Sequence, residues 1–136
     1  MDKSLYLEKN ISQQPAIDLL RSMGYTYISP EDCETQRGSR YQVLLKDILR
    51  GQLRRLNRYA FAGAENEFSA ANIERAMEDL DEPLTDGLVR ASEKIYDALL
   101  LGRSYPETVG EGKTLSFNLK YIDWEHPENN LFHVTE

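Results

Sequence analysis

The sequence predicts an α+β domain, with helices packed against a mostly antiparallel sheet and residues 1–136 forming a single domain. Apolar residues recur at the helical period of about 3.6 as far as Leu101, and after Gly102 the pattern changes to the alternation typical of strands. A length of 136 residues suits one domain with a core of its own. The composition, 40% hydrophobic and 29% charged, is that of an ordinary globular protein.

The first predicted helix follows Ser12, whose hydroxyl suits an N-cap, and Pro15 falls in its first turn, where the missing N–H costs little. Gly24 stands where a helix C′ residue belongs. The aromatic and β-branched residues 25–29 predict a strand, and the polar, turn-rich residues 30–39 predict a loop. The apolar stripe of the helix consists of Ala16, Ile17, Leu20 and Met23.

Residues 40–58 are the most strongly amphipathic stretch of the chain and predict a second helix. Gly51 lies in its middle and weakens it by about 1 kcal/mol relative to alanine. At about 100° per residue, one half of the helix surface is apolar: Leu44, Leu45, Ile48, Leu49, Leu53 and Leu56. Four cations at four-residue spacing, here called the basic ridge, follow the opposite side: Lys46, Arg50, Arg54 and Arg58.

Two further helices are predicted in the middle of the chain. After a poorly defined connection over residues 59–68, Ser69 caps a helix that ends at Pro83. The next helix covers residues 85–101 and stops at Gly102. The predicted core faces of these helices are Ile73, Ala76, Met77 and Leu80 in the first, and Leu88, Ala91, Ile95 and Leu99 in the second.

The last part of the chain predicts β structure. Residues 105–109 and 114–124 form a β-hairpin around a tight turn at 110–113, with Leu115, Phe117, Leu119 and Tyr121 on one face. An acidic, turn-rich loop follows at 123–130, and residues 131–134 open another strand. An end inside a strand indicates a truncated domain, whose unpaired edge predicts dimers or aggregates at high concentration.

Charge is strongly segregated along the chain. Between Arg37 and Arg58 there are seven Lys or Arg and one acid, a local charge of +6 in a chain of net charge −7, so the remainder carries −13. The basic ridge therefore has two interpretations. In the first, its cations form ion pairs with neighbouring acids, and residues 65–97 contain ten acids and three bases. An acidic stretch of this kind is also typical of a solvated surface. Alternatively, four cations spread over about 18 Å contact several DNA phosphates.

The composition argues against a membrane-spanning, secreted or disulfide-rich protein. No window reaches the roughly 20 apolar residues of a membrane span, and the N-terminus lacks the apolar run of a signal peptide. The lone Cys33 excludes an intramolecular disulfide and indicates a cytoplasmic protein. A pI near 4.9 argues against a general nucleic-acid coat but leaves open a local DNA contact through the ridge.

Two short motifs resemble parts of known catalytic sites. Residues 110–114 (GEGKT) resemble the end of a phosphate-binding loop, but position 107 is Glu107 where that motif needs glycine, and a strand pattern follows. Glu111 and Lys113 match half of a Mg²⁺ nuclease motif, on a hairpin tip that is too exposed for such a site. One acidic group in the loop could bind a hard cation, although solvated loop residues are the better explanation. The group consists of Asp123, Glu125, His126 and Glu128. We therefore predict no catalytic residue and no metal ligand.

Four segments, in order, resemble one known family. They are residues 13–17 (QQPAI) with Leu19, Leu20, Gly24 and Tyr25; residues 49–57, ending in LRRLN; residues 73–80; and residues 121–124 (YIDW) with 127–130 (PENN) and 132–134 (FHV). In this order and spacing they are similar to the N-terminal region of the R (restriction) subunit of type I restriction–modification enzymes. The resemblance covers nearly the whole chain.

The resemblance implies a parent enzyme with three functions. It cleaves DNA with a Mg²⁺-dependent PD-(D/E)xK nuclease domain, moves along DNA with an ATP-driven motor, and docks onto methyltransferase and specificity subunits. In such nucleases two carboxylates hold the metal and a lysine positions the attacking water. The family's Pro-Asp and Glu-x-Lys elements lie after the strand that begins here at Leu131, and its first-helix acid is here Gln13. Asn57, Asp123 and Asn130 fall on the family pattern, and we interpret them as turn and cap residues.

The resulting prediction is the leading part of a PD-(D/E)xK-type restriction-endonuclease-like domain. Its predicted partners are DNA and the methyltransferase and specificity subunits, and no contact with a membrane is predicted. Mg²⁺ and ATP belong to the parent enzyme, whereas this chain alone needs no cofactor and neither cuts DNA nor hydrolyses ATP. The alternative is a non-enzymatic DNA- or protein-binding module that uses the basic helix 40–58. A third possibility is a structural domain that docks through its acidic helices.

Overall fold

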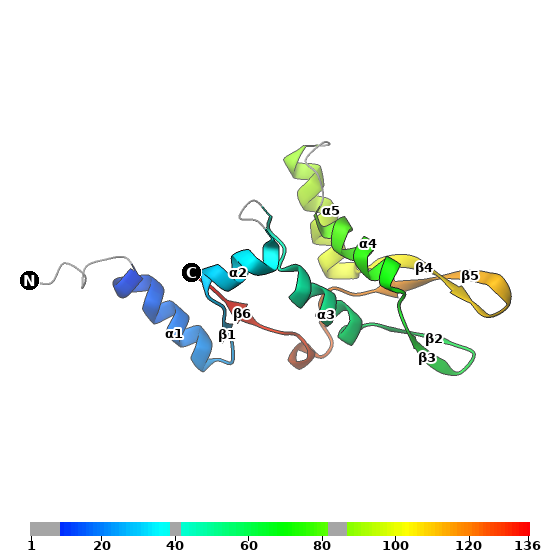
Figure 1. The fold of residues 1–136 in the computed structure, drawn as a ribbon, viewed down its shortest axis with the longest axis horizontal. Helices are drawn as coiled ribbons and strands as arrows, with labels where there is room; N and C mark the ends of the chain where they lie inside the picture. The colour runs from blue at the N-terminus through cyan, green and yellow to red at the C-terminus, as the bar shows by residue number, and fades with distance from the viewer. Residues whose placement is uncertain (1–8, 39–41, 82–86) are drawn as a thin grey trace, which may run out of the picture. The chain divides into compact units, whose positions relative to one another are not determined.

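The computed structural model describes residues 9–38, 42–81 and 87–136, which fall into two compact units. Unit 1 is discontinuous and comprises Met1–Gln42 and Leu131–Glu136, whereas unit 2 comprises Val43–Asn130. The described residues form five α-helices and three two-stranded sheets, which confirms the α+β class (Figure 1). Two of the sheets are antiparallel, as predicted, but they are separate pairs and not one sheet. The single domain over 1–136 stays a prediction.

Unit 1 contains a helix, a short parallel strand pair and a second helix. The strands pair through Thr26↔His133 and Tyr27↔Val134, and the Thr26 N–H donates to Phe132 O at 2.8 Å. The predicted cap at Ser12 is wrong, because a π-helical turn, η2, runs directly into α1. The elements are η2 (Lys9–Gln13), α1 (Gln14–Ser22), β1 (Thr26–Tyr27), α2 (Pro30–Arg37) and β6 (His133–Val134).

The predicted loop at residues 30–39 is wrong, because α2 occupies most of it. The Ser29 hydroxyl caps this helix by accepting from the Asp32 N–H at 3.1 Å, and Pro30 follows at the first helical position. Gly38 ends the helix in a left-handed conformation with φ 78°. Cys33 is its only buried residue. The helix is thus defined by its caps more than by an apolar stripe.

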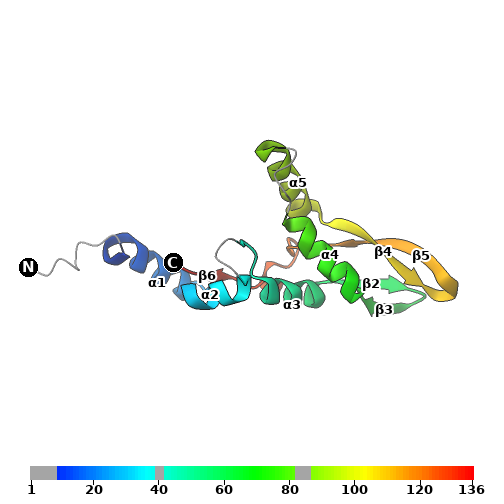
Figure 2. The same ribbon diagram turned by 45° about the horizontal axis from the view of Figure 1, so that its top comes forward.

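Unit 2 contains three helices and two antiparallel hairpins, which run side by side in both views (Figures 1 and 2). The connection over residues 59–68 proves to be the first hairpin, and the second predicted hairpin is confirmed as the pair β4–β5. Its predicted second strand, 114–124, is too long, because β5 ends at Leu119. The rings of Tyr59 and Phe117 stack at 4.5 Å and join the two hairpins. The elements are α3 (Lys46–Leu56), β2 (Arg58–Phe61), β3 (Ala64–Glu67), α4 (Ala70–Leu80), α5 (Leu88–Leu101), β4 (Arg103–Val109), η4 (Gly110–Gly112), β5 (Lys113–Leu119) and η5 (Pro127–Asn129).

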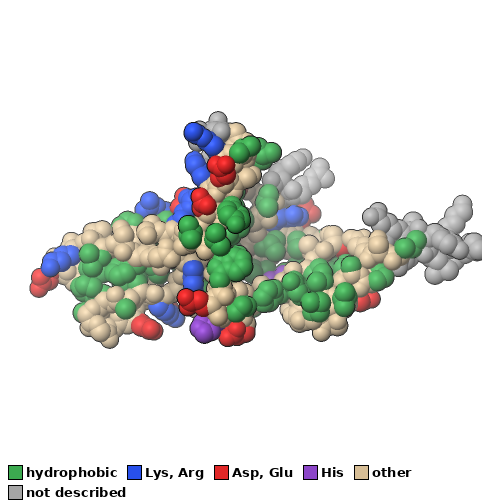
Figure 3. Space-filling view, turned by 180° about the vertical axis from the view of Figure 1, so that it is seen from behind, with side chains coloured by type: hydrophobic (Ala, Val, Ile, Leu, Met, Phe, Trp, Pro, Cys, Tyr) green, Lys and Arg blue, Asp and Glu red, His purple; other side chains and the backbone are tan. Residues whose placement is uncertain are grey.

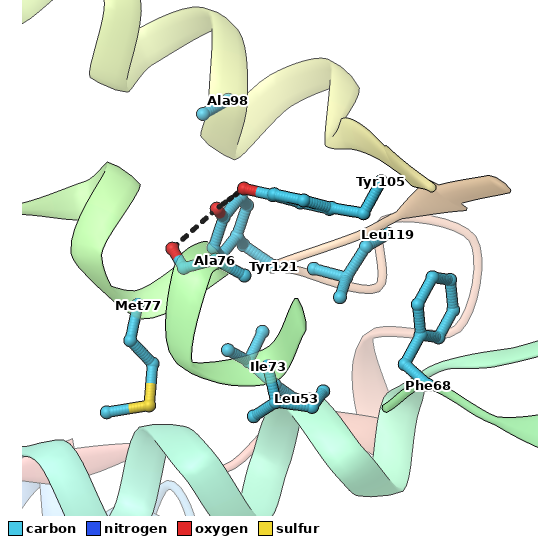
Figure 4. Packing of buried hydrophobic residues seen from close by; sticks show 9 residues of the cluster. All are labelled: Leu53, Phe68, Ile73, Ala76, Met77, Ala98, Tyr105, Leu119 and Tyr121. Carbon is cyan, nitrogen blue, oxygen red and sulfur yellow. Dashed lines mark hydrogen bonds between the residues drawn. The ribbon is translucent and has the colours of Figure 1, made fainter. Parts of the chain in front are cut away.

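The core of unit 2 lies between α3, α4, α5 and the β4–β5 hairpin (Figure 4). Its fully buried side chains include Leu53, Ile73 and Leu119. The Tyr121 hydroxyl donates to Ala76 O at 2.7 Å, so a polar bond crosses the core. The predicted core face of α4 is confirmed, and the Ser69 hydroxyl caps this helix by accepting from the Asn72 N–H.

The last helix, α5, differs from its prediction in two respects. It begins at Leu88, and the predicted start at residue 85 and the predicted end of the preceding helix at Pro83 lie outside the described residues. Ala91 is buried as predicted, but Leu88 is 69% exposed and not in the core. None of the described helices is both long and apolar enough to cross a bilayer.

Candidate nucleic-acid interface

The helix that carries the basic ridge is shorter than predicted. Helix α3 runs from Lys46 to Leu56, residues 42–45 before it are not helical, and residues 40 and 41 lie outside the described part of the chain. It ends because the backbone of Asn57 is extended, with φ −118° and ψ 126°. The Asn57 amide donates to Leu53 O at 2.9 Å and to Lys120 O at 2.8 Å, and its Oδ1 accepts from the Lys120 N–H at 2.8 Å. A distant segment therefore fixes the end of the helix.

The four ridge cations do not share one helix. Lys46, Arg50 and Arg54 lie on α3, whereas Arg58 begins strand β2, so its predicted place on the helix is wrong. Arg58 faces Glu67 across the hairpin, and its Nη1 lies 2.6 Å from Glu67 Oε1. Such a cross-strand pair stabilises the hairpin modestly. Whether any of the four cations binds DNA stays a prediction.

Arg50 lies at the centre of an ion-pair cluster between α3 and α4. Its Nε donates to Glu74 Oε1 at 2.5 Å, and its Nη1 to Asp47 Oδ1 at 2.9 Å. The hydrogen bond from Arg50 lowers the pKa of the Glu74 carboxyl, and the charges of Arg54 and Lys46 act in the same direction. The same hydrogen bond raises the pKa of Arg50. Two carboxylates thus offset most of the charge of the three ridge cations on α3.

The ridge nevertheless keeps two exposed cations. Among the described residues, carboxylates hold Arg50 and Arg58 in ion pairs, but none holds Lys46 or Arg54. These two side chains lie eight residues apart on α3, which is about 12 Å along the axis. That spacing is comparable to the width of the DNA major groove, about 12 Å. The pair can therefore reach phosphates on both edges of one groove.

A second cluster forms where the chain leaves β5. The side chain of Asp123 is 3% exposed, and its carboxylate accepts from the His126 N–H at 3.0 Å and from Asn129 Nδ2 at 3.1 Å. The bond from Asn129, followed by that from His126, lowers the pKa of Asp123 to about 2. Lys120 Nζ lies 3.3 Å from the same carboxylate. Asn130 bonds both the N–H and the C=O of Asp123, each at 2.9 Å, and closes the loop.

Helix α3 is bonded to this loop. Gln52 Nε2 donates to Asn129 O at 2.9 Å, and the guanidinium of Arg55 donates to the same oxygen. Two of the family-like segments, LRRLN and YIDW…PENN, therefore meet in one hydrogen-bonded cluster. We call it the motif knot, consisting of Asn57, Asp123, Asn129 and Asn130. The bonds of Asn57, Asp123 and Asn130 to backbone atoms agree with the interpretation of these three as turn and cap residues.

The two buried carboxylates of unit 2, Asp123 and Glu107, are used in hydrogen bonds within the protein. Both oxygens of Asp123 accept hydrogen bonds from the protein. The buried Glu107 accepts from the Ser69 N–H and from Asn72 Nδ2, both at 2.8 Å, at the start of α4. Within the described ranges, no group of three His, Cys, Asp or Glu side chains is placed to hold a metal ion. We derive no reaction step through a metal from these residues.

The glycine-rich segment 110–114 is a hairpin turn. Gly110–Gly112 form one turn of 3₁₀-helix between β4 and β5, with Glu111 in a left-handed conformation of φ 62°. Lys113 and Thr114 belong to β5, where a phosphate-binding loop would begin a helix. The interpretation as a turn is confirmed.

One comparison with known proteins gave a match. The family model described as "Type I restriction enzyme R protein N terminus" matches residues 5–136. No curated protein and no solved structure matches the chain.

Proposed function

This chain belongs to the family of type I restriction enzyme R proteins, as their N-terminal region, and from that premise we propose that it is the leading part of an R subunit. Membership implies a restriction complex and an interaction with DNA. The parent we propose cleaves DNA with Mg²⁺ through a PD-(D/E)xK-type nuclease domain, moves along DNA with ATP, and assembles with methyltransferase and specificity subunits in the cytoplasm. No catalytic residue or cofactor site is assigned to the described residues.

We further propose that this chain contributes a contact with the DNA backbone through α3. The observation that carries the proposal is the exposed pair Lys46 and Arg54, which forms no ion pair with a carboxylate among the residues that the structure describes and which matches the major groove in spacing. Arg50 and Arg58 contribute less, because each must exchange a carboxylate for a phosphate. The contact carries no base specificity, since phosphates are the same in every sequence.

The salt dependence of DNA binding tests this proposal. Fluorescence anisotropy with a labelled duplex, between about 50 and 200 mM salt, gives the slope of log K against log salt. The double variant Lys46→Gln, Arg54→Gln removes two phosphate contacts, so its slope becomes shallower by about 1.8. The matched control is Arg90→Gln, Lys113→Gln, which removes two exposed cations, one from α5 and one from the start of β5.

We expect the control to keep the slope of the original chain. Equal losses in both double variants would show that overall charge, and not α3, governs binding. Absence of binding at about 50 mM salt would remove the phosphate contact from the proposal altogether.

A further inference from the structure

Helix α5 carries apolar side chains on two sides. Ala91 and Ala98 are buried against the rest of unit 2. Facing away from that core, Leu88 is 69% exposed and Tyr96 is 64% exposed, and hydrophobic, acidic and basic side chains share the helix surface in Figure 3. The exposed apolar residues on this side, here called the α5 stripe, are Leu88, Val89, Tyr96 and Leu100. A surface helix normally has one apolar side, so the second indicates a partner.

Trp124 extends the α5 stripe at the C-terminal end of the helix. Its side chain is 59% exposed, although its Nε1–H donates to Leu99 O at 2.9 Å. Together with the end of α5 (residues 99–101), Gly102 and Ile122 it lines one hollow, whose charged border is Lys120, Asp123 and Glu125. Leu88, Val89 and Tyr96 line another hollow further along the same helix. Apolar surface thus follows α5 along its length.

The hydrogen bond of Trp124 lowers the free-energy cost of burying its indole ring under a partner. Its donor is already satisfied within the protein, so a partner can cover the ring without leaving a buried N–H unpaired. The bond also restricts the side chain before binding, which lowers the entropic cost of association. Tryptophan and tyrosine are the residue types most enriched among side chains that dominate binding energy.

The charges beside the stripe indicate what covers it. Glu93 and Asp97 lie next to Leu88, Val89 and Tyr96 in the same hollow. In a symmetric antiparallel pair of α5 helices, this acidic border would face its own copy, and like charges repel. The same carboxylates repel an anionic membrane surface. A partner segment with an apolar side and basic residues beside it complements both the apolar stripe and its acidic border.

We propose that the α5 stripe and Trp124 form a docking surface for an amphipathic helix of another protein, with lysine or arginine beside its apolar face. Its apolar side chains enter the hollows along α5, and its cations pair with Glu93 and Asp97. This surface is separate from the phosphate contact on α3 and does not depend on it.

Trp124 is the single tryptophan of the chain, so its fluorescence reports directly on this surface. The probe is a synthetic helix of about 18 residues, five turns long, with leucine on one face and lysine along the borders. The comparison peptide has glutamate in place of every lysine. We expect the lysine peptide to shift the Trp124 emission to shorter wavelength in a saturable way, and the glutamate peptide to bind about tenfold more weakly or less.

Matched variants assign the binding to the stripe. Leu88→Ser, Tyr96→Ser removes two exposed apolar side chains from α5, and we expect it to weaken the lysine peptide about tenfold or more. The control is Leu19→Ser, Met23→Ser on α1, where the two side chains are 62% and 66% exposed, and it should bind as the original chain does. All four residues are exposed, so both variants keep their fold.

Several outcomes would overturn the proposal. These are an unshifted emission with the lysine peptide, equal binding of both peptides, or equal losses in both double variants. Sedimentation gives another: a dimer that dissociates in Leu88→Ser, Tyr96→Ser would make a second copy the occupant. A blue shift of Trp124 with phosphatidylcholine vesicles, as large as that with the peptide, would make it a lipid surface.

Discussion

Replacing Asn57 by alanine should destabilise unit 2 by about 3 kcal/mol. The side chain is 4% exposed and makes three hydrogen bonds, to Leu53 O, Lys120 O and the Lys120 N–H. Each such bond contributes about 1 kcal/mol, and backbone groups left unpaired in the interior increase the loss. Alanine removes all three bonds at once, so the end of α3 separates from the segment after β5.

Urea unfolding followed by Trp124 fluorescence measures this loss, because the tryptophan lies in the same unit as Asn57. Asn57→Asp is the informative companion. It keeps an acceptor for the Lys120 N–H but places a carboxylate oxygen against Leu53 O and Lys120 O, so we expect a loss of similar size. Asn118→Ala is the control, since its single long bond to Leu101 O at 3.4 Å lies on the exposed surface.

A change below about 0.5 kcal/mol in Asn57→Ala would refute the reasoning, because that is the range of ordinary surface substitutions. Full stability of Asn57→Asp would show that the two donated bonds are not important. In either case the Asn57 bonds would not be what holds the end of α3 to Lys120.

Three other predictions follow from the same contacts. The pKa of Asp123 is lowered from 3.8 to about 2, so its ionised carboxylate stabilises the fold fully above pH 3.8, and this stabilisation is lost as the pH falls toward 2. Acid unfolding followed by Trp124 fluorescence should therefore differ between the original chain and Asp123→Asn in this pH range. Coincident unfolding curves would contradict the prediction. Glu74→Gln removes one of the two ion pairs of Arg50 and leaves the pair with Asp47, which lowers stability by less than about 1 kcal/mol. It steepens the salt slope of DNA binding by up to about 0.9, and an unchanged slope would exclude Arg50 from the phosphate contact. The purified 136-residue protein should show neither Mg²⁺-dependent nicking of plasmid DNA nor ATP hydrolysis, and nicking that persists through purification and disappears with EDTA would show that it has an active site.

The sequence predicted those elements in which local signals agree. Helix α4 has a capping serine, Ser69, followed by an apolar stripe, and the structure confirms both. Helix α2 was missed because its only buried side chain is Cys33, so it has no stripe. Its caps were nevertheless visible as Ser29 and Gly38, and greater weight on cap residues would have found it.

Other errors came from contacts that no local pattern reveals. The periodicity of α3 continues to Arg58, but the helix ends earlier because Asn57 bonds Lys120, which is 63 residues away. The β2–β3 turn contains Ala62 with φ 51° in place of the Asn-Gly typical of such turns. On α5, periodicity placed Leu88 in the core, since a helix with two apolar sides gives no indication of which one is buried.

The two interpretations of the basic ridge apply to different residues. Counting cations along the sequence gave four equivalent charges, but Glu74 and Glu67, from other elements, pair with Arg50 and Arg58. These two arginines are therefore held in ion pairs, whereas Lys46 and Arg54 only lower the pKa of Glu74 through their charge and form no ion pair with a carboxylate in the described part of the chain. A phosphate contact through two cations predicts a modest salt slope, about half of that expected for four. The measured slope therefore decides how much of the ridge is used for DNA and how much for holding α3 to α4 and β2 to β3.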